Sequence, residues 1–75
     1  MRPAYMRIRD QIKNEIDQEI WKIGERLPSE RDLSETFQVS RMTLRQAISL
    51  LVEDGVLERR VGSGTFVAST RVQEK

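Results

Sequence analysis

The sequence of 75 residues contains no cysteine and no histidine. The lack of cysteine excludes disulfide bonds, and the lack of both residue types removes the usual ligands of a zinc ion. A chain of this length forms one small domain, which gains little net stability from its core. We therefore expect a domain without metal or cofactor that depends on side-chain packing, with dimerisation or a neighbouring domain as further sources of stability.

Long hydrophobic runs are missing as well. No apolar stretch approaches the roughly 20 residues that a membrane-spanning helix needs. The N-terminus also lacks the apolar segment of a secretory signal peptide. The absence of cysteine is compatible with a reducing compartment. We expect no membrane partner and a cytoplasmic location.

Catalytic groups are scarce. The chain has no histidine or cysteine, no paired carboxylates in a plausible cleft and no glycine-rich phosphate loop, and its serines have no base to activate them. We therefore do not expect an enzyme. Aromatic residues make up only 5% of the chain and form no stacking array, which disfavours RNA as a ligand.

An excess of positive charge is lacking too, because the net charge is only +1. A protein that holds nucleic acid by bulk charge would be more basic, so a nucleic-acid interpretation depends on where the charges lie. Nearly all the acids belong to the N-terminal helix, to residues 30–35 and to residues 53–58, and no Asp or Glu occurs from Thr36 to Val52.

The most informative pattern lies within that acid-free stretch, at residues 39–51. Apolar residues spaced i, i+3, i+4 and i+7 predict one buried stripe of a helix, made of Leu44, Ala47, Ile48 and Leu51. The opposite side carries Arg41, Met42, Arg45, Gln46 and Ser49. A helix with cations and amides on its outer face suits a partner rich in hydrogen-bond acceptors. DNA base edges and phosphates are the leading candidate, and an acidic protein surface is the alternative.

An amphipathic pattern also marks the N-terminal part of the chain. Apolar residues at steps of three and four predict a helix over about residues 4–20, with a core-facing stripe of Tyr5, Ile8, Ile12, Ile16, Ile20 and Ile23. The repeat is too short to favour a coiled coil. We expect Trp21 to cover the edge of the domain, with an interaction surface as the alternative, and Gly24 to end the helical region.

A second, shorter helix is predicted over about residues 30–37. The residue before a proline is pushed out of the helical region, so Leu27 should be extended. Ser29 can cap the helix, with an acid three residues later. Arg31 falls in the first turn, where a cation opposes the helix dipole. It can bind a phosphate there or pair with Glu35 one turn later, and the spacing does not decide between the two.

The short helix and the helix at 40–53 together have a helix-turn-helix layout. Gln38 and Val39 form a tight turn, and Ser40 can cap the following helix. Two helices joined by about three residues, the second with an exposed polar N-terminal end, match a DNA-reading arrangement. An ordinary antiparallel pair of helices fits the spacing equally well.

A β-hairpin is predicted after Gly55, which is suited to end the preceding helix. The strands read as residues 57–61 and 65–68, joined by the turn at residues 62–64, and Phe66 is expected in the core. A hairpin that follows such a helix is a wing, and its candidate DNA contacts are Arg59, Arg60, Ser63 and Thr65. A plain edge hairpin that closes the core remains compatible.

Taken together, these residues resemble the winged helix-turn-helix domain of the GntR family of bacterial transcription regulators. The resemblance rests on four motifs in order, at residues 27–33 (LPSERDL), 39–47 (VSRMTLRQA), 53–60 (EDGVLERR) and 62–67 (GSGTFV). It covers about residues 4–68. The tail at 69–75 looks most like the HutC-type branch of the family.

The resemblance implies a mainly α fold with a small β-hairpin (α+β), formed by three helices and a two-stranded wing. It implies a DNA-binding domain at residues 1–68, followed at 69–75 by a tail or the start of a linker to an absent effector-binding domain. The expected partner is a double-stranded, palindromic operator, bound as a homodimer held mainly by that absent domain. A metabolite would act only through the absent domain, and repression is the expected outcome. A winged-helix module that binds another protein is the alternative function.

The resemblance also implies particular contacts with DNA. Arg31 matches a phosphate-contacting arginine, and Gly62 and Gly64 match a wing tip that enters the minor groove. Contacts from the second helix of the motif are implied for Ser40, Arg41, Thr43 and Arg45. Arg41 and Arg45 are the expected base readers. Met42 and Gln46 lie on the same face, where Met42 suits the methyl group of thymine.

Overall fold

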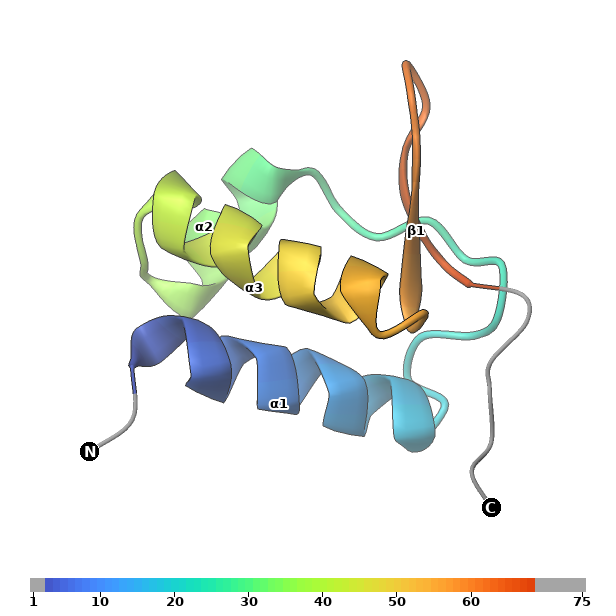
Figure 1. The fold of residues 1–75 in the computed structure, drawn as a ribbon, viewed down its shortest axis with the longest axis horizontal. Coiled ribbons are helices and arrows are strands. Elements are labelled where there is room, and N and C mark those ends of the chain that lie inside the picture. The colour runs from blue at the N-terminus through green and yellow to red at the C-terminus, as the bar shows by residue number, and fades with distance from the viewer. Residues whose placement is uncertain (1–2, 69–75) are drawn as a thin grey trace.

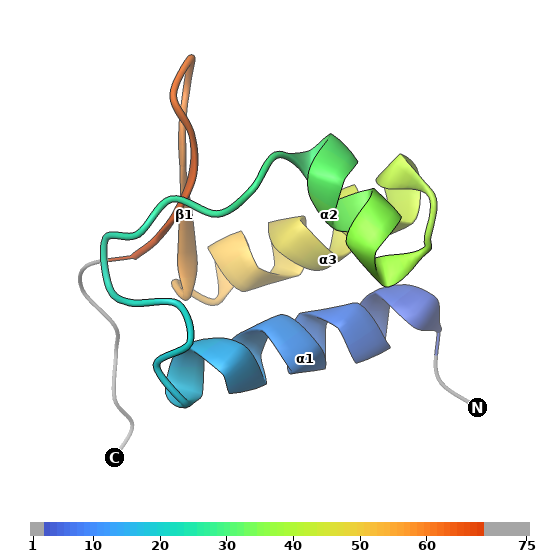
Figure 2. The same cartoon turned by 180° about the vertical axis from the view of Figure 1, so that it is seen from behind.

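The computed structural model describes residues 3–68. Its elements are α1 (Ala4–Asp17), α2 (Glu30–Phe37), α3 (Arg41–Glu53), β1 (Leu57–Arg60) and β2 (Gly64–Val67). Figures 1 and 2 show α3 lying along α1, with α2 packed beside the first half of α3 and the hairpin at its far end. The tip of the hairpin points away from α1. The predicted fold class, three helices with a two-stranded wing, is confirmed.

The core lies between α1, α3 and the start of the hairpin. Ile8, Ile12 and Ile16 of α1 are at most 4% exposed. They pack in one cluster with the predicted stripe of α3, Leu44, Ala47, Ile48 and Leu51, which is at most 1% exposed. Burial of each such Leu or Ile stabilises the fold by about 1.5–3 kcal/mol. The stripe therefore fixes which side of α3 is turned outward.

Helix α1 ends earlier than its apolar pattern predicts. Glu19 adopts a left-handed conformation with φ 65°. The amides of Glu19 and Ile20 then bond back to the carbonyls of Ile16 and Glu15, which closes the helix as a Schellman-type end. Because the chain turns here, Ile20 and Ile23 are 58% and 60% exposed. The predictions that both belong to the core stripe and that Gly24 ends the helix were wrong.

Trp21 takes the covering role that we predicted for it. Its ring packs against the core cluster, and its Nε1 donates a hydrogen bond of 2.8 Å to Oε1 of Glu15. An indole with its N–H bonded in this way can cover an apolar edge without leaving a polar atom unpaired.

The connector between α1 and α2 is extended, as predicted around Leu27, and it also pairs with the hairpin. The amides of Gly24 and Leu27 donate to the carbonyls of Val67 and Thr65 at 2.9 and 2.8 Å. The amide of Val67 donates in turn to the carbonyl of Glu25 at 2.9 Å. Strand β2 therefore has a partner on each side, which the sequence did not predict.

The hairpin is antiparallel, and its register runs from the pair Leu57–Val67 to the pair Arg60–Gly64. β1 ends one residue earlier than predicted, so that Val61 joins the turn. β2 both begins and ends one residue earlier than predicted, so that Gly64 belongs to it. Leu57 and Val67 face the core at 2% and 0% exposure.

Phe66 lies on the other side of the hairpin, because successive residues of a strand alternate between faces. Its side chain is only half-buried, and the guanidinium carbon of Arg60 lies 4.2 Å from the centre of its ring. The prediction that Phe66 belongs to the core was therefore wrong.

Two further predictions concern the C-terminal tail and membrane-spanning helices. The prediction of a tail at residues 69–75, with its HutC-type resemblance, lies outside the described residues. Within residues 3–68, every helix is too short or too polar to cross a bilayer.

Candidate nucleic-acid interface

A concavity with a volume of about 670 Å³ lies between α2, the N-terminal half of α3 and the hairpin. Its lining consists of Arg26, Leu27, Pro28, Ser29, Glu30, Arg31, Arg41, Arg45, Arg59, Arg60, Val61, Gly62, Ser63, Gly64 and Thr65. Six arginines and a single acid, Glu30, are among these residues. We call this lining the arginine concavity. A concave surface with such an excess of cations attracts a polyanion.

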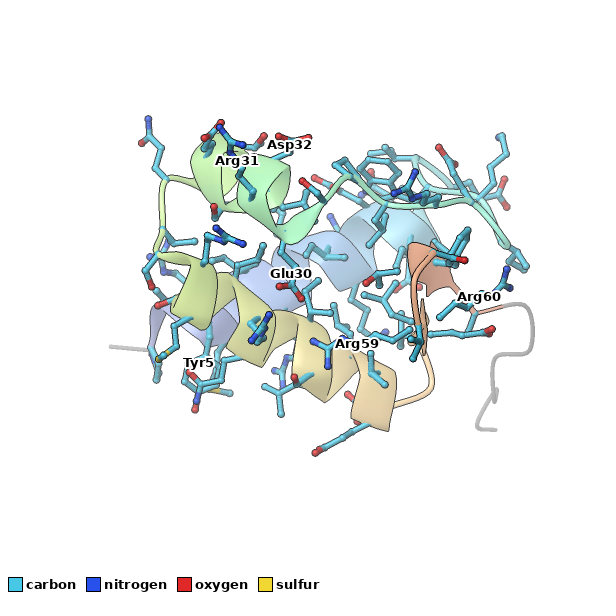
Figure 3. All side chains as sticks on the ribbon, turned by 90° about the horizontal axis from the view of Figure 1, so that it is seen from above. Tyr5, Glu30, Arg31, Asp32, Arg59 and Arg60 are labelled. Carbon is cyan, nitrogen blue, oxygen red and sulfur yellow. The ribbon has the colours of Figure 1, made fainter. Side chains whose placement is uncertain are left out.

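The start of α2 places Arg31 on the outer side of the concavity. Ser29 caps the helix, and its Oγ accepts a hydrogen bond of 3.1 Å from the amide of Asp32. Figure 3 shows Arg31 and Asp32 on the side of α2 that is turned away from α3. The Nε of Arg31 lies 3.8 Å from Oε2 of Glu35, and both side chains are at least 70% exposed. Such a pair contributes about 0–1 kcal/mol, so it would give way easily to a phosphate.

The start of α3 is capped by Ser40, as predicted. Ser40 Oγ accepts from the amide of Thr43 at 3.1 Å and donates to its Oγ1 at 2.9 Å. The first turn of α3 contains no acid. The exposed side chains of Arg41 and Gln46 make this end of α3 polar and cationic. Met42 is 78% exposed, which is unusual for a large apolar side chain and leaves it free for a partner.

Arg45 and Arg59 meet at Glu30, the acid of the concavity. The Nε of Arg45 lies 3.2 Å from Oε1 of Glu30, and a terminal amino group of Arg59 lies 3.6 Å from Oε2. Arg59 also donates to Oγ of Ser49 at 3.3 Å. Figure 3 shows Glu30 and Arg59 turned toward the space between α2, α3 and the hairpin. The cluster therefore joins the first residue of α2 to the middle of α3 and to β1.

The hairpin contributes a cationic flank and an open tip. Arg60 bonds to Oε2 of Glu58 at 2.9 Å besides lying over the ring of Phe66. Gly62 has a φ of +78° with open space around it. It and Ser63 are exposed, whereas Thr65 is half-buried beside the connector. The tip therefore exposes backbone atoms and small side chains, with no bulky side chain to hinder close approach of a ligand.

Arg26 reaches the concavity from the connector because position 64 is a glycine. A β-carbon on Gly64 would stand 2.8 Å from Nε of Arg26, closer than real β-carbons approach their neighbours. Gly64 also has a φ of +124°, which side-chain-bearing residues rarely adopt. The absence of a side chain there gives the guanidinium of Arg26 its place beside the hairpin.

Most of the predicted site residues converge on the arginine concavity. Those that line it are Arg31, Arg41, Arg45, Arg59, Arg60, Gly62, Ser63, Gly64 and Thr65. Ser40, Met42, Thr43 and Gln46 are not among its lining and belong to the first turns of α3 next to it. The sequence reasoning missed Arg26 and Glu30. Glu30 was visible only as an acid near a helix start, and nothing in its spacing pairs it with arginines 15 and 29 positions away.

Comparison with known proteins places nearly all of the described residues in one family. Residues 4–67 match "Bacterial regulatory proteins, gntR family". Over 69 residues, the chain is 44% identical to the probable fructoselysine utilization operon transcriptional repressor of Escherichia coli K12, covering 92% of this chain and 28% of that protein. It is 43% identical over 72 residues to the HTH-type transcriptional repressor NagR of Bacillus subtilis 168, covering 96% of this chain and 30% of that protein. The chain thus spans less than a third of the length of these curated relatives.

Solved structures agree with this placement. The structure of AraR(DBD) in complex with operator ORE1 superimposes with a TM-score of 0.87 at 40% sequence identity. The similarity covers 91% of this chain and 83% of that chain. The fold of three helices and a hairpin is therefore shared with a protein that was solved on its operator.

Proposed function

The chain belongs to the GntR family of bacterial regulatory proteins, and on that premise we propose that it is the sequence-specific, double-stranded DNA-binding domain of a transcriptional repressor. The observation that carries the proposal is the arginine concavity. Cations from the connector, α2, α3 and the hairpin converge there, next to a helix end without acids. The domain acts by binding and not by catalysis.

The N-terminal half of α3 is the part that reads bases in this proposal. Arg41 and Arg45 would enter the major groove, where an arginine donates two hydrogen bonds to O6 and N7 of guanine. Met42 would contact a thymine methyl group, and Gln46 would lie over the same base pairs. Ser40 and Thr43 would fix the end of α3 against the sugar-phosphate backbone.

The remaining contacts position the domain on the duplex. Arg31 would bind a phosphate at the start of α2. Arg59 and Arg60 would follow the backbone along the hairpin. The tip formed by Gly62, Ser63 and Gly64 would enter the adjacent minor groove, where the lack of bulky side chains permits close approach. Thr65 would contact the backbone at the rim of that groove.

The functional protein is proposed to be a homodimer on a pseudo-palindromic operator. The two copies would be held mainly by an effector-binding domain that lies outside residues 1–68. A small metabolite would then control binding through that domain, in the cytoplasm. The curated relatives, which are repressors more than three times the length of this chain, support a division of labour of this kind.

Selection of bound sequences from a pool of random duplexes tests the proposal directly. We expect enrichment of a defined half-site, and a mirrored pair of half-sites where two copies bind. A gel shift with unselected duplex should already reveal weaker, salt-sensitive binding. A chain that shifts no duplex and enriches no sequence would favour the alternative of a protein-interaction module.

A further inference from the structure

Glu30 is the only acid among the described residues that line the arginine concavity. Its side chain is 24% exposed, much less than the 68% of Arg45 or the 41% of Arg59. A carboxylate at this place repels phosphates and lowers the affinity of the surface for any duplex. We therefore infer that Glu30 has a role other than the attraction of DNA.

The geometry of the Arg45 contact indicates such a role. Glu30 binds Arg45 through Nε, the inner nitrogen of the guanidinium, at 3.2 Å. Within residues 3–68, the hydrogen bond and the ion pair of Arg45 both involve Nε, and its two terminal amino groups have no such partner. These two groups are able to donate in parallel to a guanine. The contact thus restrains the side chain without occupying the groups that would read a base.

Arg59 binds the other oxygen of the same carboxylate. One terminal amino group of Arg59 contacts both Oε2 of Glu30 and Oγ of Ser49. Arg59 of the hairpin therefore contacts the same carboxylate as Arg45. Both oxygens of Glu30 are then engaged, and the carboxylate cannot rotate without breaking one contact. Arg45 is held in a defined direction relative to the hairpin.

We propose that Glu30 is a positioning residue for base readout: it holds Arg45 ready for its base pair and thereby raises sequence discrimination while lowering affinity for DNA in general. The inference rests on the proposed DNA-binding function. An arginine has many rotamers, and fixing one before binding reduces the entropy lost on recognition. An arginine without this restraint would bind phosphates and bases more nearly alike.

The test compares Glu30→Gln with Glu35→Gln in the otherwise unchanged chain. Both substitutions remove one negative charge from α2, but Glu35 contacts Arg31 on the outer side and lies outside the lining of the concavity. Affinities are measured for the selected duplex, for a scrambled duplex and for selected duplexes changed one base pair at a time. Thermal unfolding followed by circular dichroism verifies that each variant is folded.

For Glu30→Gln we expect tighter binding to the scrambled duplex and a loss of roughly three- to tenfold in the ratio of selected to scrambled affinity. The loss of preference should be confined to the same base pairs at which the Arg45→Ala variant loses its preference. For Glu35→Gln we expect all duplexes to bind more tightly by a similar factor, with the ratio preserved.

Two results would overturn the inference. One is an equal response of both variants, which would reduce Glu30 to a general negative charge. The other is a loss of preference spread evenly over all base pairs, which would indicate a structural role. If Glu30→Gln fails to fold, Glu30→Asp replaces it, because this variant keeps the charge but has a shorter side chain. The ratio of selected to scrambled affinity should then fall without tighter binding to scrambled DNA. An unchanged ratio would contradict the inference. An unaltered chain that shows no preference at all would instead contradict the proposed function.

Discussion

The Nε of Arg26 lies 2.8 Å from the point where a β-carbon on Gly64 would stand. Arg26 belongs to the connector and Gly64 to β2. The two residues lie close together because the connector pairs with β2. The glycine at position 64, where β2 begins, thus has two consequences: it permits a backbone with positive φ, and it leaves room for the guanidinium of Arg26.

The first prediction follows from this contact. Gly64→Val should displace Arg26 and strain the backbone, at a cost of about 1–3 kcal/mol in the free energy of unfolding. It should also weaken binding to operator DNA, as measured by fluorescence anisotropy. Gly62→Val is the matched comparison, because Gly62 also has positive φ but has nothing within 4 Å of its would-be β-carbon. It should strain the backbone without displacing Arg26. A folded Gly64→Val variant with unchanged DNA affinity would show that the wing is only structural.

The second prediction concerns base readout by α3. Arg45→Ala should abolish the preference for operator over scrambled duplex, because a bidentate contact to guanine provides about 1–3 kcal/mol of discrimination. Binding to scrambled DNA should be weakened less. Competition titrations with both duplexes measure the ratio, and an unchanged ratio would show that Arg45 does not read a base.

The third prediction separates positioning contacts from readout. Arg31→Ala should weaken binding to all duplexes alike, because a phosphate contact carries no sequence information. It should also reduce the slope of log K against log[salt] by about 1. A selective loss for the operator would place Arg31 on a base instead.

The fourth prediction concerns the electrostatic part of binding as a whole. If each protomer neutralises roughly four to six phosphates, log K should fall with log[salt] at a slope of about −4 to −5. Titrations between low and physiological salt provide the slope. A flat response would rule out the arginine concavity as the DNA-binding surface.

The fifth prediction tests the start of α3. Ser40→Ala removes the hydroxyl that accepts from the amide of Thr43, and loss of such a cap costs about 0.5–2 kcal/mol in the free energy of unfolding. Urea denaturation measures this cost. Ser63→Ala, at the exposed turn of the hairpin, is the control and should leave the unfolding midpoint nearly unchanged.

The sequence was most informative where one local interaction decides the structure. The periodicity of Leu44 and its neighbours predicted the buried side of α3, and Ser29 and Ser40 predicted the starts of α2 and α3. Each of these features depends on residues within two turns of a helix. The outer face of α3, and with it the contributions of Arg41 and Arg45 to the candidate site, followed from the same pattern.

The sequence was least informative where the conformation depends on tertiary contacts or on a single step in register. Glu19 carries no sign of a left-handed turn, because glycine or asparagine is the usual residue there. For Phe66, a shift of one position in the hairpin register exchanges the two faces of the strand. The contacts of Glu30 with Arg45 and Arg59 exist only after three elements have packed together, so local spacing could not predict them.

The pairing of the connector with β2 determines how the hairpin meets a ligand. A hairpin of two four-residue strands is marginal in water on its own. Bonded to the connector, β2 becomes the inner strand of a short three-stranded arrangement, and it is held at residues 24–27 of the chain. The distance from the exposed face of α3 to the tip at residues 62–64 is consequently set when the chain folds. For the proposed function, this means that the spacing between α3 and the hairpin tip selects a duplex whose two grooves match it, and that binding costs little further conformational entropy of the hairpin.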